Sequence, residues 1–168
     1  MRQLIIEADL RRFLEDRCVP LDADVLELRE RIQALLASGD EAHRAARLLV
    51  KHGIHGQAIG SLEEVIMRFG EAIALAFGRR IAEGEGYHWK AAELVRIYCA
   101  VFRPDLSRQA AQVQRLRERR NKVKYLGEIV GPTDLAVFSK VVDDFIPAFR
   151  AEPIDRLLRN HGRPGSRP

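Results

Sequence analysis

The sequence predicts an all-α protein built as a helical bundle, and three observations lead to this fold class. Valine and isoleucine recur at helical spacings, and no Asn-Gly or Asp-Gly dipeptide marks a β-hairpin. The chain of 168 residues is 46% hydrophobic and 31% charged, an ordinary globular composition. A chain of this length buries most of its apolar surface in one core, so we expect it to fold without metals or disulfides.

The first two of seven expected helices form a hairpin ahead of the rest. The first covers residues 4–17 and stops at Val19-Pro20, because proline disfavours helix at the residue before it. The second covers residues 24–37 with an apolar face at offsets of three and four. That face consists of Val25, Leu28, Ile32 and Leu35. We assign residues 1–37 to an N-terminal helical extension.

The third and fourth helices begin the central bundle. Ser38 and Glu41 match a capping box, which predicts a new helix from Ser38 to about His52. A long helix over residues 57–82 follows, apolar over a wide face, and we expect it to be the core helix. Its glycines each weaken a helix by about 1 kcal/mol relative to alanine, so we expect another backbone close to them. They are Gly60, Gly70 and Gly78.

Glycine and proline delimit the last three helices. The fifth covers residues 88–102, after a glycine-rich break, and the sixth covers residues 107–126. The seventh begins after Gly131-Pro132, and Pro147 kinks or ends it. We therefore place the bundle at residues 38–151 and interpret residues 152–168 as a flexible basic tail, because the tail shows no helical periodicity.

Positive charge is concentrated on the sixth helix. Residues 108–124 hold seven basic side chains and one acid, a net +6, whereas the whole chain carries +4 and its remainder therefore −2. A local positive potential of this kind attracts polyanions, of which nucleic acids are the commonest. The basic residues are Arg108, Arg115, Arg117, Arg119, Arg120, Lys122 and Lys124. A solvated helix face with no ligand is the alternative.

Arg120 occupies an apolar position of this helix. Val113, Leu116 and Val123 mark the buried stripe, and Arg120 stands where leucine would complete it. A guanidinium on a packed face requires an acidic partner, a groove or a subunit interface, unless the side chain extends along the surface into water. Adjacent acids elsewhere, Glu63-Glu64 and Asp143-Asp144, are expected on solvated faces, although one of them could pair with Arg120.

An RNA-binding strip is expected on one side of the same helix. Asn121 and Tyr125 are four residues apart and project together, with Arg117 one turn earlier. Guanidinium and amide groups bind phosphate oxygens, and a tyrosine ring can stack on an unpaired base. A packing role for Tyr125 is an equal alternative. The proposed phosphate contacts are Arg115, Arg117, Arg119, Lys122 and Lys124.

Three segments in order, GQAIGSLEEVIMRFGEAIALAF, GYHWKAAELV and RERRNKVKY, resemble the HEPN family of all-helical domains. The resemblance covers about residues 40–151. It implies a HEPN-like bundle, a homodimer whose two motif helices form one site, and metal-independent endoribonuclease activity. It also implies a role in a toxin–antitoxin or phage-defence system, with an antitoxin protein as a possible partner.

The HEPN motif is an arginine, commonly followed by a polar residue, with a histidine four to six residues later. Arg120-Asn121 matches its first half, but Tyr125 stands where the histidine would be. A phenol with a pKa of about 10 is a poor general base at neutral pH, and an imidazole near 6.5 is a good one. His88 could take the place of the missing motif histidine if the fold brings His88 close to Arg120. A packing or capping role is the commoner one for a histidine at a helix start. The predicted catalytic set is therefore Arg120, Asn121, Tyr125 and His88, and the alternative is a non-catalytic interaction or regulatory module.

No metal or other cofactor is expected. His52 and His55 have no third ligand nearby in sequence, and Gly84-x-Gly86 does not follow a strand as a phosphate-binding loop would. Cys18 and Cys99 are expected to be reduced thiols. No leader or membrane span is recognisable, so a cytoplasmic location is the default expectation.

Overall fold

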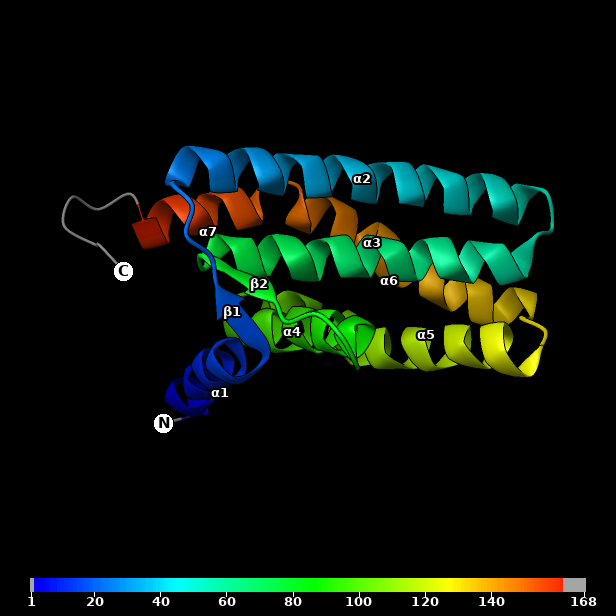
Figure 1. The fold of residues 1–168 in the computed structure, drawn as a ribbon. Helices are drawn as coiled ribbons and strands as arrows, with labels where there is room; N and C mark the ends of the chain where they lie inside the picture. Colours follow the sequence, from blue (N-terminus) through cyan, green and yellow to red (C-terminus); the bar gives the residue numbers. More distant parts are fainter. Residues whose placement is uncertain (1, 162–168) are drawn as a thin grey trace.

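Helices dominate the computed structural model of the protein, which describes the backbone of residues 2–161 and the side chains of residues 7–161 (Figure 1). The seven α-helices of this part are α1 (Arg2–Arg17), α2 (Val25–Lys51), α3 (His55–Ala76), α4 (Tyr87–Phe102), α5 (Ser107–Leu126), α6 (Pro132–Phe149) and α7 (Glu152–His161). A 3-10 turn, η1 (Pro104–Leu106), precedes α5, and β1 (Cys18–Pro20) pairs antiparallel with β2 (Arg79–Ile81). The predicted all-α fold class is confirmed.

The central element is α3, as the sequence predicted for its apolar helix. It packs against α2 along their common length and also contacts α4, α5, α6 and α7 (Figure 1). Its side chains are buried on most sides, including Ile59, Leu62, Ile66 and Ile73. Because the surrounding helices cover these apolar groups, α3 sets the position of the other helices.

The helix break predicted at Ser38 does not form. Helix α2 begins where the sequence placed it, with the Asp24 carboxylate accepting the Glu27 N–H at 2.9 Å, but it continues unbroken to Lys51. Gly39 lies buried against Phe69 of α3. Packing against α3 therefore keeps the chain helical through the Ser-x-x-Glu pattern, and the boundary drawn at residue 37 falls inside a helix. The expected N-terminal hairpin does not form either, because α1 packs against α4 instead of α2 (Figure 1).

Helix α3 is shorter than predicted, because Gly78 turns the chain out of the helix with a φ of 67°. The following residues form β2 instead of a last helical turn. Close approach of a second backbone is found at Gly70, where a Cβ would lie 2.5 Å from the Ala91 carbonyl oxygen of α4. At Gly60 a Cβ would meet nothing within 4 Å, so the expectation fails there.

The C-terminal region differs most from the prediction. Helix α6 includes Pro147 and ends two residues after it. The expected flexible tail is instead a helix over Glu152–His161, whose Leu157 is buried beside Leu28 and Ile32. The Tyr98 hydroxyl donates to the Glu152 carboxylate at 2.6 Å and fixes α7 to α4. Residues 162–168 of the predicted tail lie outside the described part.

Candidate functional site around Glu63, His88 and Arg120

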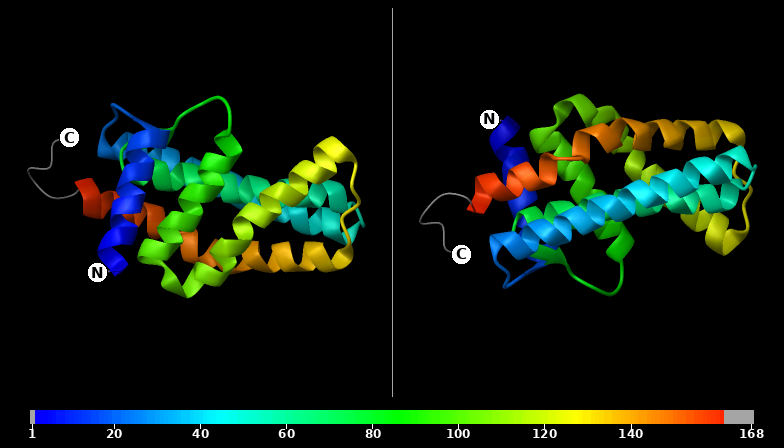
Figure 2. Two further views of the ribbon diagram at one scale, coloured as in Figure 1. Left: turned by 90° about the horizontal axis from the view of Figure 1, so that it is seen from below. Right: turned by 90° about the horizontal axis from the view of Figure 1, so that it is seen from above.

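Three helices bring the candidate site together. Seen from below, α4 and α5 diverge from the η1 turn, and α3 passes behind both (Figure 2, left). His88 lies in the first turn of α4, Arg120 lies in α5, and Glu63 lies in α3. The site therefore depends on the docking of both diverging helices against the core helix.

Arg120 is paired with a buried acid. Its Nε lies 2.9 Å from Glu63 Oε2, and the two side chains are 19% and 6% exposed. Among the charged residues of the described side chains, Glu63 is the one that is buried. The solvated position expected for Glu63 was therefore wrong, and Glu63 is the acid that pairs with Arg120. Its neighbour Glu64 instead pairs with Arg68 at the surface of α3.

His88 approaches the other oxygen of the same carboxylate. Its Nδ1 lies 3.5 Å from Glu63 Oε1, an ion-pair separation without hydrogen-bond geometry. Glu63 Oε1 is buried and, within residues 7–161, has no hydrogen-bond donor. The His88 side chain is 45% exposed, so one edge of the imidazole faces the carboxylate while the ring remains accessible to solvent. Arg120 and His88 thus share one buried carboxylate.

Burial raises the pKa of the Glu63 carboxyl above its usual value, because the charged form is poorly solvated. Arg120 and His88 act in the opposite direction, with a smaller effect from Arg117. The Glu63 carboxylate therefore holds the side chains of Arg120 and His88 close to each other. Perturbed carboxyls with specific charged partners are common at functional sites, although structural ion pairs show them too.

Asn121 joins the cluster, whereas Tyr125 does not contact it. The Arg120 Nη1 donates to Asn121 Oδ1 at 3.2 Å, and Arg117 Nε donates to Gln114 on the same side of α5. Tyr125 is 68% exposed near the end of the helix, with the Lys124 ammonium 5.2 Å from its ring centroid. Its ring is available for stacking on a base, but in the described part of the chain its hydroxyl forms no hydrogen bond with Glu63 or Arg120.

The remaining basic residues divide between different faces of α5. Arg119 is occupied by Glu128 and Asp134 and donates to the Ile129 carbonyl at 2.9 Å, so it holds the connection between α5 and α6. Arg115 is exposed and lines hollows on the α6 side of α5. Lys122 and Lys124 are exposed. Of the predicted phosphate contacts, Arg115 and Arg119 therefore face α6 and lie away from the Glu63–Arg120 pair.

Sequence reasoning missed Glu63 as a site residue, although a signal was present. Glu63 follows Ile59 by four residues and precedes Ile66 by three, so it interrupts an apolar stripe in the way that Arg120 does. Two opposite charges that each interrupt an apolar stripe are candidates for pairing with each other, because burial of either alone is unfavourable.

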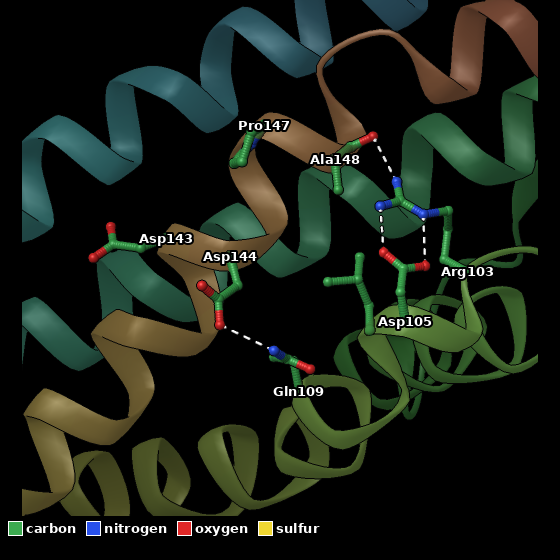
Figure 3. Close-up of a pocket in the computed structure, with 8 residues that line it drawn as sticks. Arg103, Asp105, Gln109, Asp143, Asp144, Pro147 and Ala148 are labelled. Carbon is green, nitrogen blue, oxygen red and sulfur yellow. Dashed lines mark hydrogen bonds and ion pairs between the residues drawn. The ribbon is translucent and has the colours of Figure 1, made fainter.

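A separate pocket lies where α6 crosses η1 and the start of α5 (Figure 3). Its charged groups are satisfied within the protein: Arg103 forms two bonds to Asp105 at 3.0 and 2.7 Å, and Gln109 donates to Asp144 at 3.0 Å. Asp143 is paired with His43 at 2.6 Å. These contacts connect helices, and we assign this pocket no chemistry.

In the described residues, no group of three or more His, Cys, Asp or Glu side chains is arranged to hold a metal ion. Nor is any helix there long and apolar enough to cross a membrane. Cys18 and Cys99 are free, buried thiols. Comparison with family models, with curated proteins and with solved structures found no match to this chain.

Proposed function

We propose that the protein binds RNA and cleaves it without a metal ion, at a site formed by Glu63, His88, Arg120 and Asn121. The observation that carries the proposal is the buried Glu63 carboxylate, which is paired with Arg120 on one oxygen and approached by His88 on the other. A carboxylate that orients a histidine next to a fixed cation is a recurrent arrangement for proton transfer beside a developing negative charge.

In the proposed reaction, the His88 imidazole accepts the proton of a ribose 2′-hydroxyl, and the 2′-oxygen attacks the adjacent phosphorus. The bond to the 5′-oxygen of the next nucleotide breaks, and the imidazolium returns the proton to that oxygen. The products are a 2′,3′-cyclic phosphate and a 5′-hydroxyl end. Arg120, oriented by Glu63, stabilises the charge on the phosphorane, and Asn121 orients the phosphate.

His88 is better supported than Tyr125 as the proton-transfer group. Its ring is adjacent to the carboxylate that also holds Arg120, and it is accessible to a substrate. Tyr125 projects from the exposed end of α5, where it suits base stacking. The separation of 3.5 Å between His88 and Glu63 is longer than in a working dyad, but such contacts commonly tighten when substrate binds.

The partners and setting of this proposal come from the HEPN resemblance. They are a homodimer that places two copies of α5 at a shared site, a cytoplasmic location, and a toxin–antitoxin or defence system with an antitoxin as partner. The homodimer is tested by light scattering or sedimentation of the purified chain.

A non-catalytic RNA-binding or regulatory module is the second candidate. It is favoured by the engagement of Arg120 inside the protein, where Nε contacts Glu63 and one terminal nitrogen contacts Asn121. An arginine used in this way supports the fold without touching a substrate. This candidate predicts salt-dependent RNA binding without turnover.

The test is cleavage of a fluorescent RNA in EDTA, with the 3′ ends of the products analysed for cyclic phosphate. His88→Gln should lower the rate by about 10²–10⁴-fold and Arg120→Lys by about 10²–10³-fold, the ranges typical of a lost general base and a lost charge stabiliser. Control variants are His52→Gln and Arg44→Gln, both at exposed positions outside α3, α4 and α5. All variants are first shown to melt cooperatively.

A rate in His88→Gln equal to that of the wild type would remove the catalytic role of His88. An unchanged rate in Arg120→Lys would remove the role of Arg120 and with it the enzyme proposal. RNA binding without cleavage in the wild type favours the second candidate. A substrate with 2′-deoxyribose at the cleaved position should bind and remain intact.

A further inference from the structure

A groove of about 610 Å³ separates α5 from α6. Its floor is apolar and includes Ala136, Val137 and Val141 of α6. The hydrogen bond from Gln109 of α5 to Asp144 of α6 crosses one end of the groove, where the groove adjoins the pocket of Figure 3. Val137 is 47% exposed although it belongs to this apolar surface, so the groove is open to solvent.

The rim of the groove is positive. Arg108 is exposed and forms no ion pair within the described residues, and Arg115 donates to the neutral side chain of Gln112. Lys140 pairs at 3.2 Å with Asp144, the acid of this lining. Two guanidinium charges therefore remain uncompensated along an apolar floor.

This combination fits a protein helix better than a nucleic acid. Bound RNA requires donors along its phosphates and aromatic surfaces for its bases, and alanine and valine supply neither. An amphipathic helix instead places apolar side chains at i, i+3, i+4 and i+7 in such a floor and its polar side chains at the rim. From Thr133 to Asp144 the α6 lining spans about 16 Å, enough for about three turns.

We propose that this groove binds an acidic amphipathic helix of a partner protein, with apolar side chains on Val137 and carboxylates beside Arg108 and Arg115. Residues 162–168 of this chain do not fit, because they contain Arg163 and Arg167 and no acid. The groove lies on a different side of α5 from the candidate RNA site, since residues 115 and 120 diverge by roughly 140° around a helix. The two proposals are therefore independent.

The probe is a fluorescent, capped 14-residue peptide with leucine at positions 3, 6, 7 and 10, glutamate beside the leucines and alanine elsewhere. A second peptide has lysine in place of every glutamate, and a uridine-rich RNA of matched charge is the third probe. Binding is measured by fluorescence anisotropy at low and physiological salt. The acidic peptide should bind at least about tenfold more tightly than the basic one, with an affinity that falls as salt rises.

Two variants locate the binding, each with a matched control. Val137→Asp should weaken the acidic peptide about tenfold or more, and Leu158→Asp, at a side chain exposed to 45% against 47% for Val137, should not. Arg108→Glu with Arg115→Glu should have the same effect. Its control, Arg29→Glu with Arg44→Glu on α2, changes the net charge equally at exposed positions.

The proposal is overturned if the acidic peptide binds no more tightly than the basic one, or if the control variants lose as much affinity as the groove variants. It is also overturned if RNA alone binds and loses affinity in the Arg108 and Arg115 variant, because the groove is then a nucleic-acid surface. Activity of the His88 and Arg120 variants has no bearing on these outcomes.

Discussion

Replacing Arg120 by leucine isolates the energetic role of the Glu63–Arg120 pair. Breaking a buried ion pair from one side costs about 3–5 kcal/mol, because the other charge remains without compensation. The destabilisation caused by Arg120→Leu has an upper limit here, because Glu63 can take up a proton and lose its charge. Protonating a carboxyl with a pKa of about 4.3 at pH 7 costs about 3.7 kcal/mol, at about 1.4 kcal/mol per pH unit. We therefore expect Arg120→Leu to lower the free energy of unfolding by about 3 kcal/mol at pH 7.

The sign of the pH dependence follows from the direction of the Glu63 pKa. Burial raises this pKa in the folded state, and Arg120 is the first of the groups that oppose the rise. Loss of Arg120 raises the pKa further, so the folded variant binds a proton more tightly than the unfolded chain does. Its stability then falls as pH rises above the unfolded pKa of Glu63. The cost of Arg120→Leu should shrink to about 1 kcal/mol at pH 5.

The double variant Glu63→Leu with Arg120→Leu completes the cycle. Replacing both members of a buried pair with apolar side chains is often close to neutral, so we expect a stability within about 1 kcal/mol of wild type. Glu63→Leu alone should cost about 1–2 kcal/mol, because Arg120 can turn toward solvent. Urea denaturation at pH 7 and pH 5 measures all four proteins. Two results would refute this reasoning. One is a double variant whose loss of stability equals the sum of the two single losses within about 0.5 kcal/mol, and the other is a loss for Arg120→Leu that is equal at both pH values.

Two further predictions concern the core. Gly70→Ala should destabilise by about 2 kcal/mol or more, because its Cβ would lie 2.5 Å from the Ala91 carbonyl oxygen, whereas Gly60→Ala in the same helix meets open space and should stabilise by about 0.5–1 kcal/mol. Thermal melting compares the two, and a change of the same sign in both would contradict the packing of α3 on α4. Burial raises the pKa of Cys18 to about 11 and that of Cys99 to about 12. At pH 8 both thiols should react with a disulfide reagent about 100-fold or more slowly than in urea. Rapid reaction of either thiol in the native protein contradicts its burial.

Local sequence signals were sufficient for the two helices that flank η1. The sequence predicted helices over residues 88–102 and 107–126, and the helices in the structure cover Tyr87–Phe102 and Ser107–Leu126. Arg103-Pro104 ends the first of these, and Gly127, in the left-handed region with a φ of 66°, ends the second. These punctuating residues act through their own backbone preferences, so no knowledge of the partner helices was needed.

Signals that depend on a partner were misread. The Ser38 pattern has the letters of a capping box, but a cap forms only where the chain leaves the helix, and packing on α3 keeps α2 continuous there. In the same way, Leu157 gave too little periodicity for a helix in a short basic segment. Its burial beside Leu28 and Ile32 stabilises α7 from outside the segment.

The sequence by itself determined that the protein is helical, that α5 is strongly basic, and that Arg120 lies on an apolar stripe, because these properties depend on residue type and on a period of 3.6 residues. Tertiary structure alone decided which acid meets Arg120. Glu63 lies in α3, and its carboxylate reaches Arg120 and His88 only when α4 and α5 dock on that helix. Such contacts join residues that are distant along the chain, so their free energy is set by burial and by charge separation in the folded state.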